Sequence, residues 1–231
     1  MAAAPALALP AGDARFLDEY ESLKLLAAVG IPVVEHRLCR DEGAAREAYR
    51  LLGPKVVVKA CSSSVPHKTE QGLVKLGVQD EDAVAAIFRD FKSRIPKADG
   101  VLVARHAAGR RELALGARLD PAFGPVVLLG DGGIYLEALK DFRLLIPPFG
   151  EEEARAALGE LRIAPLLEGQ RGELPLDMEA FARMAVRIGA AMLAAGGRIA
   201  SVDINPVMLF ERGRGALAVD ALVERRQTQS E

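Results

Sequence analysis

Short β-rich runs of uneven spacing dominate the sequence, and helices separate only some of them. Eight such runs are expected over residues 31–38, 55–60, 73–78, 101–104, 126–129, 199–203, 207–210 and 216–219. Strands of mixed spacing with few intervening helices favour α+β layers over a strict βαβ repeat. The sequence therefore predicts an α+β fold in which a few helices cover the sheets, without internal repeats.

Four segments have the period of amphipathic helices. The first ends at Gly30, ahead of a proline, and the second follows Asp41 and ends at Gly53. Asp80 and Asp177 are the expected N-caps of the third and fourth helices. The expected inward faces, in chain order, are Phe16/Tyr20/Leu23/Ala27, Ala45/Ala48/Leu52, Val84/Ile87/Phe88/Phe91 and Phe181/Met184/Ala185/Ile188/Met192.

Composition excludes several classes of protein. The 231 residues are 50% hydrophobic, which is enough for one large or two small cores. A net charge of -2 argues against nucleic acid or an anionic membrane as a partner. The two cysteines lack a CxxC spacing, which disfavours a zinc site or a disulfide framework and favours a cytoplasmic location.

The chain ends are expected to lie outside the folded part. Residues 1–12 have no basic n-region and predict a disordered leader instead of a signal peptide. Residues 224–231 are polar and predict a frayed tail. No apolar run approaches the roughly 20 residues that a membrane helix needs.

Lys59 follows three valines of an expected buried strand. Because an unpaired buried ammonium is costly, Lys59 is expected to point into a cleft towards an anion, although a lysine snorkelling from a strand end is the simpler alternative. The polar loop over residues 61–72 could fold over phosphates. Its His67 could be merely solvated, but the neighbouring Lys68 favours a neutral, nucleophilic imidazole and helps to hold an anion.

Two later clusters also suggest ligand contacts. Glu112 precedes the run Gly130–Gly133, whose glycines permit close approach of the backbone to a ligand, although such a run is also common in plain turns. Asp203 and Asn205 fall on one side of an expected strand, and Asn205 could meet Asp220 across a hairpin. Two oxygen ligands, completed by phosphate oxygens and water, suit Mg²⁺. An Asn-Pro pair alone would indicate only a turn.

In this order, the segments resemble the ATP-grasp domain of ADP-forming acyl-CoA (acetyl-CoA) synthetases, relatives of the succinyl-CoA synthetase β subunit. The motifs are Gly30-Ile31-Pro32-Val33, Val56-Val57-Val58-Lys59, His67-Lys68 before Gly72, Glu112-Leu113, Phe123-Gly124-Pro125-Val126, Gly132-Gly133 with Glu137, Lys140-Asp141 and Asp203-Ile204-Asn205-Pro206. The resemblance implies an α+β ATP-grasp fold over residues 13–223, with two subdomains that clasp a nucleotide between mixed sheets. The smaller, lid-like subdomain would cover about residues 38–100.

The resemblance further implies roles for single residues. Lys59 would contact the nucleotide phosphates, and Glu112 would lie on the ribose side. The backbone of Val103 and Ala104 would read the adenine. The remaining implied residues serve phosphate transfer and metal binding: His67 as a transient phosphate carrier, Asn205 and Asp220 as metal ligands, and Lys68, Gly72, Glu137 and Asp203 in support.

The implied reaction is acyl-CoA + ADP + phosphate ⇌ carboxylate + CoA + ATP, with ATP/ADP and Mg²⁺ as cofactors. No GxGxxG follows a strand, so a CoA-binding α subunit or domain is the expected partner, through which a small carboxylic acid or acyl-CoA would be bound. Leu73 and Ser201 depart from the family pattern, which usually has a glycine and an acidic residue there. The alternatives are a degenerate subunit that binds nucleotide without catalysis, and a ligase that uses an acyl-phosphate without a phosphohistidine.

Overall fold

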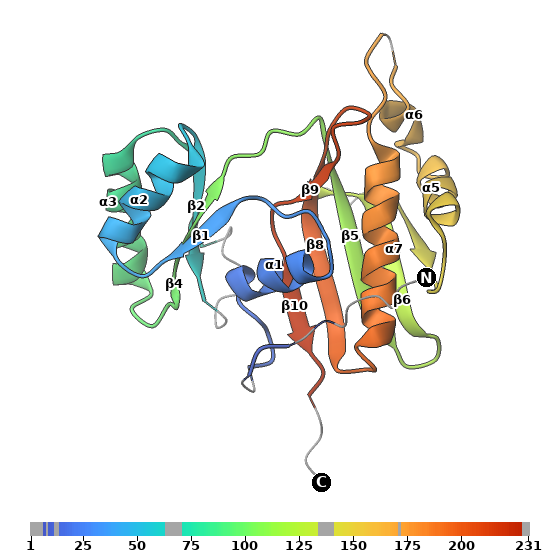
Figure 1. Cartoon of the computed structure of the whole chain (residues 1–231), viewed down its shortest axis with the longest axis horizontal. Helices are drawn as coiled ribbons and strands as arrows, with labels where there is room; N and C mark the ends of the chain where they lie inside the picture. The colour runs from blue at the N-terminus through green and yellow to red at the C-terminus, as the bar shows by residue number, and fades with distance from the viewer. Residues whose placement is uncertain are drawn as a thin grey trace. The chain divides into compact units, whose positions relative to one another are not determined.

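The computed structural model describes residues 7, 9–11, 14–62, 71–133, 141–170 and 172–227. The chain divides into two compact units, each with its own sheet (Figure 1). The larger unit comprises residues 1–15, 22–33 and 108–231, and the smaller unit comprises residues 16–21 and 34–107. The smaller unit thus covers a wider range than the expected 38–100. Helix α1 (Glu19–Ala28) begins in the smaller unit and continues in the larger one.

The smaller unit is a four-stranded sheet in the order β1-β4-β2-β3, with two helices on one face (Figure 1). Its elements are β1 (His36–Cys39), α2 (Glu42–Leu52), β2 (Val56–Cys61), β3 (Val74–Val78), α3 (Glu81–Arg94) and β4 (Gly100–Arg105). The carboxylates of Asp41 and Asp80 cap the two helices by accepting hydrogen bonds from the Ala44 and Ala83 amides, at 2.8 and 2.7 Å. The predicted inward faces of both helices are buried against the sheet, with Ile87 only partly so.

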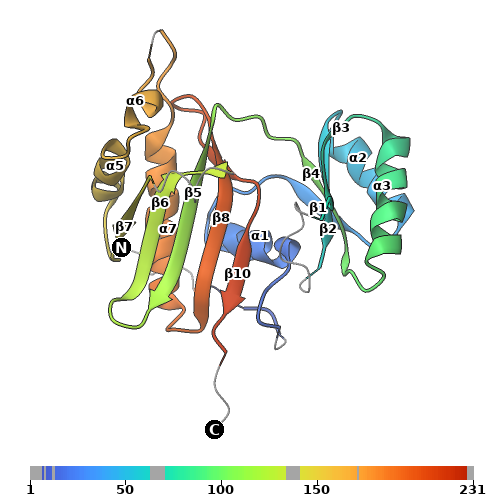
Figure 2. The same ribbon diagram turned by 180° about the vertical axis from the view of Figure 1, so that it is seen from behind.

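The larger unit is a six-stranded sheet in the order β10-β8-β5-β6-β7, with β9 also paired to β8. Its strands are β5 (Arg111–Asp120), β6 (Gly124–Asp131), β7 (Phe142–Leu145), β8 (Ile199–Leu209), β9 (Ala216–Ala218) and β10 (Leu222–Arg225). The helices α5 (Glu151–Gly159), α6 (Ala164–Leu167) and α7 (Met178–Ala194) lie on one face of this sheet, and Figure 2 shows the opposite face.

Helix α7 supplies the centre of the larger core. The five residues predicted to face inward are all buried: Phe181, Met184, Ala185, Ile188 and Met192. Asp177 caps the helix, as predicted, because its Oδ1 accepts from the Ala180 amide at 3.1 Å. The other oxygen, Oδ2, accepts from the amides of Gly213 and Gly215 at 2.9 and 2.8 Å. One carboxylate therefore joins the start of α7 to the β8–β9 hairpin.

The α+β class is confirmed, but the expected mixed sheets are antiparallel. Every pair of strands in the described part of the chain is antiparallel, and the bridge between Val33 and Ala218 is parallel. Strands β5, β7 and β10 were not anticipated from the sequence, and β8 joins the two runs expected at residues 199–203 and 207–210 into one strand. Glu224 belongs to β10, opposite Ser201, although the sequence predicts a tail from that residue onward. None of the described helices has the length and apolar character needed to cross a membrane.

Candidate functional site

Lys59 is buried in β2 and forms an ion pair with Glu19 of α1. Its Nζ donates to Glu19 Oε1 at 2.6 Å, and the two side chains are only 7% and 2% exposed. The sequence predicts an anion near this ammonium, and within the smaller unit a carboxylate fills that role. Glu19 was missed, although the helical period places it on the same face as Leu23 and Leu26, both fully buried.

Val103 and Ala104 lie in the central strand β4 of the smaller sheet. Both residues are buried and are paired on two sides, Val103 with Arg37 and Val58, and Ala104 with residues 36 and 57. Their backbone groups therefore belong to the sheet ladder and do not line a sheet edge. The His106 amide still donates to the Lys55 carbonyl at 3.0 Å, and residues 107–109 follow outside the strand.

The glycine-rich end of β6 brings together residues from two of the predicted clusters. The Gly132 amide donates to the Glu112 carbonyl at 3.1 Å, and the Gly133 amide donates to Asn205 Oδ1 at 2.9 Å. A Cβ at Gly132 would lie 2.5 Å from the Leu113 carbonyl carbon, and one at Gly133, where φ is +74°, would lie 2.6 Å from Glu112 Oε2. The glycines thus allow β5, β6 and β8 to approach closely at this point.

Asn205 and Asp220 are brought together by the β8–β9 pairing. Val207 pairs with Ala218, and the Val219 amide then donates to the Pro206 carbonyl at 3.2 Å. The next step along these segments places Asp220 opposite Asn205. An amide oxygen has two lone pairs, so Asn205 Oδ1 retains acceptor capacity beyond its bond from Gly133. Two oxygen donors of this kind fit Mg²⁺, which takes further ligands from phosphate and water.

Asp203 lies two residues before Asn205 and on the same side of β8, because the intervening Ile204 is buried. Partial desolvation raises the pKa of the Asp203 carboxyl, although the residue still reaches solvent. No group of three or more His, Cys, Asp or Glu side chains in the described ranges could by itself hold a metal ion. A metal ion held by Asn205 and Asp220 would take its remaining ligands from phosphate oxygens and water.

Other predicted residues have different outcomes. His67, Lys68 and Glu137 lie outside the described residues. Gly72 has a φ of +66°, and a Cβ there would meet no atom within 4 Å, so its backbone conformation, not lack of space, favours glycine. Leu73, which departs from the family pattern, is 1% exposed and belongs to the core of the smaller unit.

The second departure, Ser201, also has a local partner. Its hydroxyl donates to Glu224 Oε2 at 3.0 Å, and Glu224 in turn forms an ion pair with Arg15 at 2.6 Å. A carboxylate is therefore present beside Ser201, supplied by β10. The sequence could not reveal this because Glu224 was assigned to the tail.

A buried polar frame supports the glycine-rich end, and sequence reasoning missed it. Arg111 contacts both carboxylate oxygens of Asp131, at 2.7 and 2.8 Å, and the Asp131 side chain is 5% exposed. The Asp131 amide donates to the Asp141 carbonyl at 3.0 Å. The Asp141 carboxylate accepts from the amides of Arg162 and Ile163 at 3.0 and 3.1 Å. Asp141, quoted above as a sequence motif, thus has a structural role.

The sequence is similar to ATP-grasp domains and to ADP-forming acetate–CoA ligases. Residues 8–224 match the family described as an ATP-grasp domain. The chain is 36% identical to the acetate–CoA ligase [ADP-forming] I subunit beta of Pyrococcus furiosus, over 90% of each chain. It is 37% identical over 84% of its length to acetate–CoA ligase [ADP-forming] I of Archaeoglobus fulgidus, of which it spans only 29%.

The fold also matches a solved structure of the dinucleotide-forming acetyl-coenzyme A synthetase 1 of Ca. Korarchaeum cryptofilum. The TM-score is 0.81 and the identity is 32%, with 92% of this chain and 93% of that chain covered. That structure contains coenzyme A and Mg-AMPPCP, and its phosphohistidine segment points towards the nucleotide-binding site.

Proposed function

The chain belongs to the ATP-grasp family, and on that premise we propose that it is the nucleotide-binding part of an ADP-forming acyl-CoA synthetase. The observation that carries the proposal is the match to a separate β subunit from Pyrococcus furiosus, which extends over 90% of both chains. The reaction is acyl-CoA + ADP + phosphate ⇌ carboxylate + CoA + ATP. The buried cysteines Cys39 and Cys61 fit a reducing, cytoplasmic setting.

The nucleotide phosphates are assigned to Lys59, which Glu19 orients at 2.6 Å. Glu112 lies on the ribose side of the nucleotide, and the glycines at the end of β6 let the backbone approach the nucleotide closely. Asn205 and Asp220 hold Mg²⁺, which neutralises phosphate charge when bound. Because Val103 and Ala104 are paired on both sides, we assign adenine recognition to the backbone that follows β4.

His67 carries the phosphoryl group in this proposal. With ATP as donor, its imidazole nitrogen attacks the γ-phosphorus, so that the N–P bond forms as the P–O bond to the β-phosphate breaks and ADP leaves. In the direction of ATP synthesis, an oxygen of the ADP β-phosphate forms the new P–O bond as the N–P bond breaks, which frees the imidazole. The Korarchaeum relative, with its phosphohistidine segment directed to the nucleotide site, supports such a step. The supporting residues are Lys68, Gly72, Glu137 and Asp203.

A CoA-binding subunit or domain completes the enzyme. Some relatives are separate β subunits, whereas others are chains more than three times as long as the matched part. The purified chain should therefore form no ATP from acetyl-CoA, ADP, Mg²⁺ and phosphate, and activity should appear when the partner is added. ATP formation by the chain alone would contradict the proposed division of labour.

Labelling with [γ-³²P]ATP tests the phosphate-carrier role. The expected result is an acid-labile, base-stable label that is lost in His67→Ala and retained in His36→Ala and His106→Ala. His36 is a suitable control because its Nδ1 lies 2.7 Å from the Val34 carbonyl and its ring packs edge-on against Tyr20. Full turnover by His67→Ala in the complete enzyme would instead favour an acyl-phosphate mechanism without phosphohistidine.

The degenerate-subunit alternative gains no support from Leu73. A leucine that faced the phosphates would crowd a nucleotide, but Leu73 packs in the core of the smaller unit. Nucleotide binding without any labelled histidine, and without turnover when the CoA-binding partner is added, would nevertheless identify such a subunit.

A further inference from the structure

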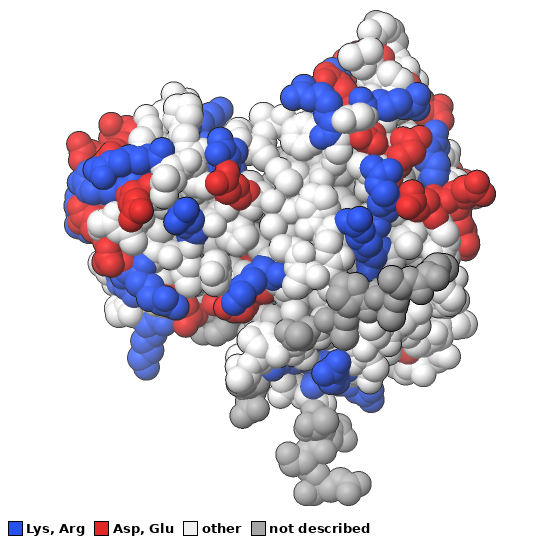
Figure 3. Space-filling view, in the orientation of Figure 1, with Lys and Arg blue, Asp and Glu red and all other residues white. Residues whose placement is uncertain are grey.

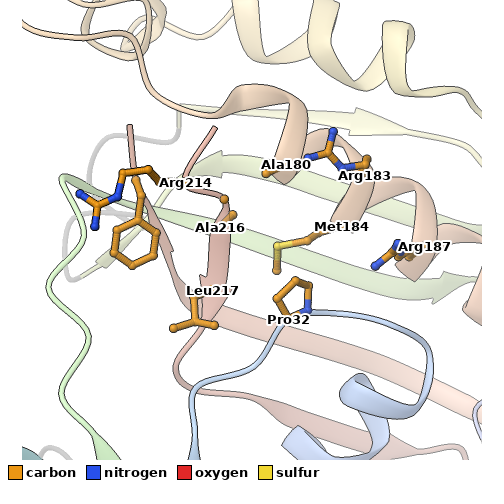
Figure 4. Close-up of a pocket in the computed structure, with 10 residues that line it drawn as sticks. Pro32, Ala180, Arg183, Met184, Arg187, Arg214, Ala216 and Leu217 are labelled. Carbon is orange, nitrogen blue, oxygen red and sulfur yellow. The ribbon is translucent and has the colours of Figure 1, made fainter. Parts of the chain in front are cut away.

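A pocket of about 400 Å³ lies in the larger unit between α7 and the β8–β9 hairpin (Figure 4). This volume falls within the range of small-molecule sites, roughly 300–1,000 Å³. Its apolar lining includes Pro32, Met184, Phe210 and Leu217. None of the candidate nucleotide-site residues lines it. Asp203 alternates with buried residues of β8 and so points to the sheet face opposite α7.

Three arginines surround this apolar lining: Arg183, Arg187 and Arg214. Arg183 and Arg187 are one helical turn apart on α7, a spacing at which like charges destabilise a helix. The Arg183 guanidinium is 4.0 Å from Glu151, and that of Arg214 is 3.3 Å from Glu211. Both side chains of the first pair are exposed, and Arg214 in the second is 70% exposed, so both pairs are weak. Figure 3 shows basic side chains along the position of α7, with acidic side chains beside some of them.

Arg187 is held in place by the segment that follows α1. Its Nη1 donates to the Gly30 carbonyl, and a Cβ at Gly30 would lie 3.2 Å from the same nitrogen. The Ala218 amide donates to the Pro32 carbonyl at 2.9 Å, which fixes this segment to β9. No carboxylate of the described chain lies within ion-pair distance of Arg187. The guanidinium is thus oriented in advance, which lowers the entropy lost when an anion binds.

We propose that this pocket binds a small organic acid. Arg187 and Arg183 hold the carboxylate, because the planar guanidinium fork matches a carboxylate better than an ammonium does. The apolar body packs against Met184, Leu217 and Pro32, which would contribute nothing to binding a bare inorganic anion. This inference is independent of the proposed nucleotide site, since the two share no residue.

Calorimetric titration of the full chain tests the proposal with phenylacetate and its neutral isostere phenylacetamide. We expect saturable binding of the acid and at least tenfold weaker binding of the amide. Arg187→Met should lower the affinity for phenylacetate by about tenfold or more, because it removes hydrogen bonds between charged groups. The affinity of Arg187→Lys for phenylacetate should lie between that of wild type and that of Arg187→Met. Arg183→Met provides a second variant that does not depend on the Gly30 contact.

Arg118→Met is the matched control. Arg118 is 69% exposed on β5 and lies outside the pocket, so its loss should leave phenylacetate binding unchanged. ADP affinity should be the same in wild type and Arg187→Met. The ADP titration thus tests the proposed nucleotide site separately from the organic-acid pocket. Equal affinity for acid and amide, or no effect of Arg187→Met and Arg183→Met, would overturn the proposal. Binding only of a peptide with a C-terminal phenylalanine would also overturn it, in favour of a docking site for a chain end.

Discussion

Replacing Glu19 by glutamine should show how much the buried pair with Lys59 stabilises the smaller unit. The side chains are 7% and 2% exposed and their nitrogen and oxygen are 2.6 Å apart, so the change leaves a desolvated ammonium without that carboxylate. Removing one partner of a buried pair costs about 3–5 kcal/mol. Because glutamine keeps an acceptor oxygen, we expect a loss near the lower bound, about 3 kcal/mol.

The chain offers a matched control in the same unit. Arg105 and Glu35 are 2.8 Å apart, but their side chains are 49% and 59% exposed. Exposed pairs contribute about 0–1 kcal/mol, so Glu35→Gln should change the free energy of unfolding by less than about 1 kcal/mol. Urea denaturation followed by circular dichroism measures both variants, with an unchanged m-value as the check that each variant unfolds in the same way.

A double-mutant cycle then isolates the interaction. Lys59→Met combined with Glu19→Gln should recover part of the loss, since no buried charge remains unmatched between the two positions. Lys59→Met should also weaken ADP binding by about 1.5–3 kcal/mol, whereas Glu19→Gln keeps the ammonium and should weaken it less. If Glu19→Gln costs no more than Glu35→Gln, or if the two changes are simply additive, burial of this pair does not have the proposed effect.

Three further predictions concern other residues. Asn205→Ala or Asp220→Ala should abolish the Mg²⁺ dependence of ADP binding in calorimetry, and an unchanged dependence would place the metal elsewhere. Gly133→Ala, with φ at +74° and Glu112 Oε2 2.6 Å from the new Cβ, should destabilise the chain by about 1–3 kcal/mol, more than Gly213→Ala, where φ is +83° and no atom lies within 4 Å. Burial, followed by the charge of Asp41, raises the pKa of the Cys39 thiol from 9.0 to about 11. Below pH 9 both states stay protonated; between pH 9 and 11 the unfolded chain ionises first, so stability should fall there more steeply in wild type than in Cys39→Ala.

Local signals in the sequence predicted helices better than strands. Asp41, Asp80 and Asp177 all cap helices as expected, because an N-cap depends on residues only three positions apart. Strand β5 was missed because Ala, Gly, Leu and Glu have weak β-propensity. Its structure comes from pairing with β6 on one side and β8 on the other.

Within the candidate site, the sequence predicted proximity only for residues that are close together along the chain. The hairpin that places Asp220 opposite Asn205 follows from strand alternation, and the structure continues the β8–β9 pairing to that point. Lys59 and Glu19, by contrast, are 40 residues apart, and no local pattern links them. The glycine run looked like a turn because the sequence does not show that β5 and β8 approach it within contact distance.

Asp177 sets the spacing between the two walls of the arginine-rich pocket. One of its oxygens accepts from Ala180 on α7, and the other accepts from Gly213 and Gly215, which flank Arg214 on the hairpin. The side chain therefore acts as a rigid spacer between Arg214 and the arginines of α7. A shorter or longer side chain at this position would change the distance between Arg214 and the arginines of α7, and with it the size of anion that spans the gap, although no residue that lines the pocket is itself substituted.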